Sequence, residues 1–250
     1  MAVIGIMSAM HEELAAVLAA MPDEQRVRVA ERDFWVGHWH GHDVVAVLSR
    51  IGKVAAATTA TVLLERFKVD ALVFTGAAGG LAPHAQVGDV VVATGLVQHD
   101  MDASPLFPRY EVPLYGRARF DTDPALSEAL AAAASQVLSD PAQHLGAQAI
   151  ADFHLLSPRV HQGLIVSGDR FVSTTAESQA LQRSLPDALA VEMEGAAVAQ
   201  VCLDYGVPFA AVRTISDRAD DDAHTDFNRF IREVASRYSL AILSQWLMHR

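Results

Sequence analysis

The stretch AVEMEGAAV, residues 190–198, joins two patterns of different period. The apolar run at 188–191 is typical of a buried strand, and the small residues at 195–201 are typical of a helix. Between them, Glu192 and Glu194 flank Met193. A carboxylate is costly to bury unless another group pairs with it. Two interpretations follow: the glutamates hold a hydroxyl-rich ligand such as a ribose, or one caps the helix while the other is solvated.

Other polar or glycine-rich segments also follow apolar runs. Glu13 comes after the first run, TGAAGG at 75–80 after another, and Ser216 and Asp217 end a third. We interpret TGAAGG as a glycine-rich turn, either a simple tight turn or one that lets the backbone approach a ligand. It does not match GxGxxG, which argues against a dinucleotide-dependent dehydrogenase. Because ligands of open α/β sheets bind outside the carboxyl ends of strands, these segments and residues 192–194 predict one site.

The remaining apolar pattern predicts the fold class. Nearly continuous apolar runs indicate strands covered on both faces of a sheet, at 3–7, 44–48, 71–74, 90–93, 164–166 and 209–215. Between them, apolar residues recur with helical spacing, as at 14–21 and 227–246. Alternating strands and helices predict an α/β layered fold. The length of 250 residues and the lack of a flexible linker predict one domain spanning 1–250.

The composition excludes several classes of protein. The net charge is −11 and no basic cluster is longer than two residues, which argues against nucleic-acid and membrane partners. Cys202 is the only cysteine, so no intramolecular disulfide can form, and without a secretion signal we expect a cytoplasmic protein. His38, His40 and His42 alternate but match no zinc signature, so we predict a surface hairpin and no metal site.

Two long loops are predicted, at 102–119 and 140–161. The first contains three prolines together with Phe107, Tyr110 and Tyr115. A long loop with aromatic side chains more often belongs to a binding site or an interface than to a simple connection.

Several motifs occur in an order that is specific to one known family. They are IGIMSAMHEE at 4–13, IGKVAAA at 51–57, TGAAGGL at 75–81, VGDVVV at 87–92, HDMDA at 99–103, GLIVSGDRF at 163–171, VEMEGAAVA at 191–199 and VRTISDRAD at 212–220. On these motifs the chain resembles, nearly from end to end, the 5′-methylthioadenosine/S-adenosylhomocysteine nucleosidases of the purine nucleoside phosphorylase superfamily.

The resemblance implies a three-layer α/β/α sandwich with a central mixed sheet, and hydrolysis of the bond between adenine and a 5′-thioribose. Breaking that bond needs an acid for the leaving base and a base for the attacking water. Asp217 corresponds to the acid acting on adenine N7, Glu13 to the base, and Glu194 to the carboxylate that holds the ribose hydroxyls. Arg213 corresponds to a residue that orients the water and Glu13, although an ion pair with Asp217 or Glu192 is the alternative. The other implied contacts with the nucleoside are Met10, Ile51, Ala77, Gly79, Phe171, Val172, Met193, Ser216 and Phe107.

The resemblance also implies a small-molecule nucleoside substrate, a homodimer, no cofactor, and a place in methionine salvage and methyl-cycle recycling. Two residues differ from the family pattern: Ala77 replaces a frequent serine, and Arg50 replaces a small residue that is often glycine. Because an arginine near the water site could bind phosphate, a phosphorolytic nucleoside phosphorylase stays an alternative, as does a non-catalytic nucleoside sensor. Futalosine and deoxyadenosine stay alternative substrates.

Overall fold

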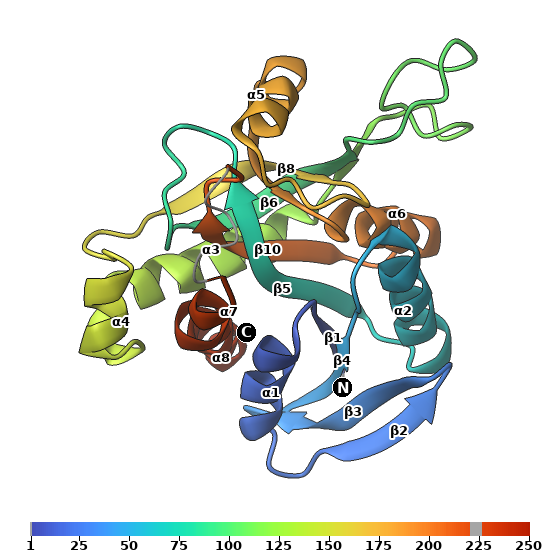
Figure 1. The fold of residues 1–250 in the computed structure, drawn as a ribbon. Coiled ribbons are helices and arrows are strands. Elements are labelled where there is room, and N and C mark those ends of the chain that lie inside the picture. The colour runs from blue at the N-terminus through green and yellow to red at the C-terminus, as the bar shows by residue number, and fades with distance from the viewer. Residues whose placement is uncertain (1, 221–226) are drawn as a thin grey trace.

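Strands and helices alternate along the chain in the computed structural model, which describes residues 2–220 and 227–250 (Figure 1). The strands are β1 (Val3–Ser8), β2 (Gln25–Val29), β3 (Arg32–Trp39), β4 (His42–Leu48), β5 (Ala71–Gly80), β6 (Val90–Gln98), β7 (Arg119–Asp121), β8 (Val160–Ser167), β9 (Ala188–Glu192) and β10 (Phe209–Asp217). The α-helices are α1 (His11–Ala19), α2 (Lys53–Arg66), α3 (Pro124–Leu138), α4 (Ala147–Asp152), α5 (Thr175–Ser184), α6 (Gly195–Tyr205), α7 (Phe227–Phe230) and α8 (Ser236–Met248). A short 3₁₀ helix, η1 (Pro141–Gln143), and a π-helical turn, η2 (Ile231–Ala235), complete the elements of the described residues.

The strands form one mixed sheet that closes partly on itself around β5. Their order is β10-β6-β8-β9-β5-β1-β4-β3-β2, and β5 also pairs with β10. Along most of its length β5 is parallel to β1 and β10, whereas Gly79 and Gly80 pair with β9 in the antiparallel sense. The carboxyl ends of β5, β9 and β10 therefore meet at one edge, and the predicted mixed sheet is confirmed.

The predicted turn at residues 75–80 is wrong, because β5 continues through Gly80. Gly76 pairs with Arg213, and Gly79 pairs with Asp217, both of β10. Small residues let the neighbouring chain approach closely here: a Cβ at Gly79 would lie 2.9 Å from the Cβ of Ala219 and 3.0 Å from Asp217 Oδ1. The glycines therefore serve a close approach of backbone within a strand rather than a reversal of the chain.

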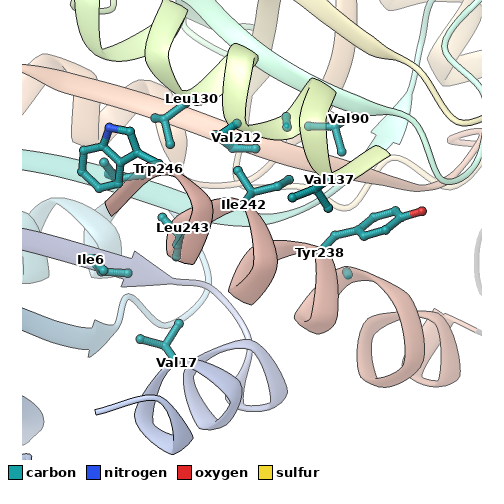
Figure 2. Close-up of a cluster of buried hydrophobic side chains, with 14 of the residues drawn as sticks. Ile6, Val17, Val90, Leu130, Val137, Val212, Tyr238, Ile242, Leu243 and Trp246 are labelled. Carbon is teal, nitrogen blue, oxygen red and sulfur yellow. The ribbon is translucent and has the colours of Figure 1, made fainter. Parts of the chain in front are cut away.

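Helices cover both faces of the sheet and complete the three layers that were predicted. α1, α3 and α8 pack on one face, and α2 and α6 pack on the other (Figure 1). On the first face, α8 lies between α1 and α3 and buries Tyr238, Ile242 and Trp246 (Figure 2). Burial on both faces explains why the central strands are apolar without alternation.

The connections differ in part from the predictions. Residues 140–161 are not a structureless loop, because they contain η1 and α4. The segment 102–119 does lack helices, and it extends away from the sheet (Figure 1). His38, His40 and His42 lie in the β3–β4 hairpin, where Trp39 pairs with His42. No helix within residues 2–220 and 227–250 is long and apolar enough to cross a membrane.

Candidate active site

A cavity of about 170 Å³ lies at the carboxyl ends of β5, β9 and β10 and beside the segment that joins β1 to α1. Side chains from distant parts of the sequence meet in its wall. Of the residues predicted to contact a ligand, the wall contains Met10, Ile51, Ala77, Gly79, Phe171, Val172, Met193, Glu194, Ser216 and Asp217. Glu192, one of the two glutamates predicted at the strand–helix junction, also lies in the wall, and the residues not predicted individually are Ala9, Ala78, Arg170, Val191 and Phe227.

Three predicted residues lie outside this wall. Glu13 and Arg213 are buried beside the cavity, next to Gly76 of β5. A Cβ built on Gly76 would lie 3.5 Å from Glu13 Oε2 and 3.7 Å from Arg213 Nη1. Phe107 belongs to the segment 102–119 and does not line the cavity of its own chain. Because the segment extends away from the sheet (Figure 1), a contact between Phe107 and the ligand stays a prediction.

Glu13 lies in the first turn of α1, and α1 starts soon after β1 ends at Ser8. Its Oε2 accepts a hydrogen bond from Met10 N at 3.2 Å, which satisfies one free N–H of the helix start. Its Oε1 is buried and has no hydrogen-bond partner within the described part of the chain. Burial raises the pKa of this carboxyl from 4.5 to about 7, although the Met10 N–H and the charge of Arg213 lower it. Glu13 is thus a carboxyl group that can take a proton at neutral pH.

Arg213 projects from β10 and forms a buried ion pair with Glu192. Its Nη2 lies 2.8 Å from Glu192 Oε2, and its Nη1 donates to the carbonyl oxygen of Phe74 at 2.8 Å. The guanidinium also stacks on the ring of Phe74, with 4.1 Å between Cζ and the ring centroid. The ion pair that sequence analysis left as an alternative is therefore the one observed, and it involves Glu192 rather than Asp217.

Glu192 holds the start of α6 as well as Arg213. Its carboxylate accepts hydrogen bonds from Gly195 N at 2.9 Å and Glu194 N at 3.2 Å, and from the hydroxyl of Ser167. These donors compensate the cost of burying a charge at a helix start, where the helix dipole also favours an anion. The sequence contains two carboxylates at this junction, but only the structure shows that Glu192 binds Arg213 and the start of α6.

Glu194 lines the cavity as Glu192 does, but different groups hold it. Its Oε1 accepts a hydrogen bond from Gly52 N at 2.9 Å, which joins it to the segment between β4 and α2. Burial and the neighbouring charge of Glu192 together raise the pKa of Glu194 to about 7, against the lowering effects of Gly52 and Arg213. Glu194 can therefore exchange hydrogen bonds with a ligand as either an acceptor or a donor.

Asp217 ends β10 next to an irregularity in the pairing with β5. The register shifts between Ile215 and Asp217, which turns the carboxyl group toward the cavity. Its Oδ1 accepts a hydrogen bond from Ala219 N at 2.8 Å, and its Oδ2 accepts one from Ser216 Oγ at 2.7 Å. Two separate donors thus fix the orientation of this side chain.

An aromatic pair, Phe171 and Phe227, forms part of the cavity wall. Phe171 and Phe227 lie with their ring centroids 6.1 Å apart and their planes at 79°. Phe171 follows β8, lines the cavity and is 39% exposed, and an aromatic ring can pack on a planar ligand. Phe227 starts α7 and was not predicted, because an isolated phenylalanine in a helical pattern gives no sign of a ligand. The cavity therefore combines an aromatic part of the wall, the carboxyl groups of Glu192, Glu194 and Asp217, and the buried carboxyl of Glu13 next to Met10.

Comparisons with known proteins agree with this arrangement. A family model described as the phosphorylase superfamily matches residues 3–245. The chain is 37% identical over 243 residues to the 5′-methylthioadenosine/S-adenosylhomocysteine nucleosidase of Marinomonas sp. (strain MWYL1), covering 97% of both chains. It superimposes with a TM-score of 0.86 on the 5′-methylthioadenosine/S-adenosylhomocysteine nucleosidase from Neisseria meningitidis in complex with methylthio-immucillin-A, at 31% identity and 100% coverage of both chains. It superimposes with a TM-score of 0.83 on the futalosine hydrolase of Helicobacter pylori strain 26695, at 31% identity, covering 100% of this chain and 98% of that chain.

Proposed function

The chain belongs to the phosphorylase superfamily, and we propose that it hydrolyses the N-glycosidic bond of 5′-methylthioadenosine and S-adenosylhomocysteine, releasing adenine and the 5′-thioribose. One observation carries the proposal. Glu13 is a buried carboxyl with a pKa of about 7 and an oxygen that has no partner among the described residues, next to a cavity that contains Glu194 and Asp217. Such a group is suited to remove a proton from water at neutral pH.

The reaction assigns one task to each carboxyl group. Glu13 takes a proton from a water molecule as the water oxygen attacks C1′ of the ribose. The bond from C1′ to N9 breaks, its electrons pass into the purine, and Asp217 delivers a proton to N7. Glu194 holds the ribose hydroxyls and its negative charge stabilises the cationic character that develops on the sugar.

The remaining wall residues bind the two halves of the nucleoside. The ring of Phe171 stacks on adenine, and the backbone of Val172 hydrogen-bonds the edge of the base. Met10 and Met193 contact the ribose, and Gly79 allows the sugar to approach the backbone of β5. Phe227 closes the aromatic side beside Phe171.

The electrostatics support hydrolysis over phosphorolysis. The charge of Arg213 is neutralised by Glu192 at 2.8 Å, and the guanidinium of Arg50 donates to the carbonyl oxygen of Glu31. The carboxylates of Glu13 and Glu194 would repel an incoming phosphate, and the charge of Arg213 is not available to attract it. A neutral water molecule is not repelled. Burying these carboxyl groups also costs stability, which argues for catalysis over passive sensing of nucleosides.

The assembly and location are part of the same proposal. We propose a cytoplasmic homodimer of single-domain chains, spanning 1–250, that needs no cofactor and binds neither nucleic acid nor membrane. The segment 102–119 supports a contact between subunits, because Leu106 is 84% exposed and Leu114 is 93% exposed on it. In such a dimer Phe107 approaches the cavity of the twin subunit.

Product analysis tests the reaction directly. The purified chain is incubated with 5′-methylthioadenosine in buffer without phosphate and in buffer with abundant phosphate. We expect adenine and free 5-methylthioribose in equal amounts under both conditions. Release of adenine only with phosphate, together with a sugar 1-phosphate, would overturn the proposal in favour of phosphorolysis.

A further inference from the structure

A second cavity adjoins the active-site cavity and is a groove of about 800 Å³. Ala9, Met10 and Ile51 line both spaces, so the groove begins where the active-site cavity ends. We call it the α1 groove, because it lies between α1 and the strands β3 and β4; its walls include Leu14, Leu18, Asp33, Trp35, Leu48 and Arg50.

The alternation of β3 explains why this groove has an apolar floor and a charged rim. Phe34 is buried in the core on the α2 side of the sheet, so Asp33 and Trp35 point to the α1 side. There Trp35 packs with Leu18 and Leu48 at the margin of the core. The groove therefore offers apolar surface to a chain of methylene groups, and polar groups where it opens to solvent.

Arg50 lines the α1 groove and precedes Ile51, which lines both spaces. Its backbone has a φ of +64°, which is a left-handed conformation that a residue with a Cβ adopts at a cost. Its guanidinium donates to the carbonyl oxygen of Glu31, so the hydrogen bond fixes its place on the rim without neutralising its charge. The carboxylate of Glu31 itself is held by Arg28 at 2.7 Å. Arg50 thus presents a positive charge at the mouth of the α1 groove.

A polar group of opposite character lies on the same wall. Asp33 Oδ1 is buried and has no hydrogen-bond partner within the described residues, and its nearest cations, Arg28 and Arg26, approach its carboxylate only to 3.7 and 3.9 Å. A buried oxygen without a donor is costly and marks a place where a donor from a ligand would be favourable. The groove therefore combines a cation at its mouth with an unsatisfied acceptor.

The orientation of the substrate under the proposed function points its 5′ end toward this groove. Asp217 and Phe171 define the end of the cavity that receives the base. Glu194 defines the position of the ribose, and its bond to Gly52 N places the sugar beside Ile51. The 5′ carbon projects from the ribose in the direction away from the base. In this orientation the 5′ substituent passes between Met10 and Ile51.

We propose that the α1 groove binds the end of a carboxylate-bearing 5′ substituent and that Arg50 pairs with this carboxylate. The proposal rests on the proposed function. In S-adenosylhomocysteine the substituent is an amino acid, whose carboxylate meets Arg50 and whose ammonium donates to Asp33 Oδ1. In 5′-methylthioadenosine the substituent ends at a methyl group and does not reach the groove. Arg50 is therefore a specificity-determining residue that chooses between substrates without touching the reacting atoms.

The test compares kcat/KM for three adenine nucleosides in variants at position 50. The substrates are 5′-methylthioadenosine, S-adenosylhomocysteine, and a 5′-thioadenosine whose substituent ends in a carboxylate without the amine. The main variant is Arg50→Gly, which should fold well because glycine adopts a φ of +64° without strain. Lys68→Gly is the matched control, because Lys68 is also a cation at positive φ, +52°, but lies after α2 and outside the groove.

We expect Arg50→Gly to lower the ratio of kcat/KM for each carboxylate substrate over 5′-methylthioadenosine by about tenfold, the low end for a charged hydrogen bond, because Arg50 is exposed. Arg50→Lys should lower it less, since it keeps the charge but loses the planar fork. Lys68→Gly should leave the ratio unchanged. An unchanged ratio in Arg50→Gly, or a fall for the amino acid substrate alone, would overturn the inference. Failure of the parent chain to release adenine from 5′-methylthioadenosine would instead contradict the proposed function.

Discussion

Replacing Glu13 by glutamine is expected to make the fold more stable at neutral pH while slowing adenine release by at least about a hundredfold, the low end for loss of a general base. Glu13 is fully buried, and burial raises its pKa from 4.5 to about 7. Glutamine has nearly the same shape and can still accept the hydrogen bond from Met10 N. It has no charge to bury and no basic oxygen to receive a proton from water.

The magnitude and its pH dependence follow from the raised pKa. Between pH 4.5 and about 7 the folded chain binds more protons at Glu13 than the unfolded chain does, so the free energy of unfolding falls as the pH rises through this window. Each pKa unit corresponds to about 1.4 kcal/mol, so the full shift lowers the stability of the parent by about 3 kcal/mol. The gain from Glu13→Gln should therefore be small near pH 4.5, grow up to about pH 7, and stay constant above it.

Urea unfolding of the parent and of Glu13→Gln at a series of pH values measures this difference. Glu12→Gln is the matched control, because it removes a carboxylate from the same turn of α1 at a position that is only partly buried. The kcat for 5′-methylthioadenosine is measured on the same preparations. A stability difference that does not change with pH would refute the argument from burial, and a kcat within a few-fold of the parent would refute the role of Glu13 as base.

Three further predictions concern the remaining machinery. Asp217→Asn keeps the size of the side chain but has no acidic proton, so kcat for 5′-methylthioadenosine should fall by at least about a hundredfold while binding of an unreactive analogue, measured by calorimetry, weakens far less. Glu192→Gln leaves Arg213 buried without its counter-charge and should lower the free energy of unfolding in urea by about 3 kcal/mol; a loss below about 1 kcal/mol would contradict the buried ion pair. Gly79→Ala places a Cβ 3.0 Å from Asp217 Oδ1 and 2.9 Å from the Cβ of Ala219. It should therefore displace the side chain of Asp217 and lower kcat for 5′-methylthioadenosine; a kcat equal to that of the parent would contradict this expectation.

Local patterns in the sequence determined the fold class and the edge at which the site lies. Near-continuous apolar runs indicated the central strands, because a strand covered on both faces needs apolar side chains in both directions. Glu13, Glu194 and Asp217 each lie within six residues of the end of an apolar run. Their location at one edge could be predicted because the carboxyl ends of parallel strands lie together, whatever the order of the strands.

Elements that depend on non-local pairing could not be predicted. β2 was missed because four of its five residues are exposed, so it carries no apolar run. The glycines of residues 75–80 predicted a turn because glycine is uncommon in strand interiors, yet these residues extend β5. Their strand conformation depends on hydrogen-bond partners in β9 and β10, more than a hundred residues further along the chain.

The sequence determined which carboxyl groups stand near the site, and only the tertiary structure decided what each of them does. Glu192 and Glu194 are equivalent candidates until Arg213 is seen to neutralise the first and Gly52 to bind the second. Phe227 lines the cavity although no motif predicted it, because the direction of a side chain depends on how distant segments pack, which no local spacing records. Burial sets the charge of Glu13 in the same way, because a pKa responds to the removal of water by the whole fold.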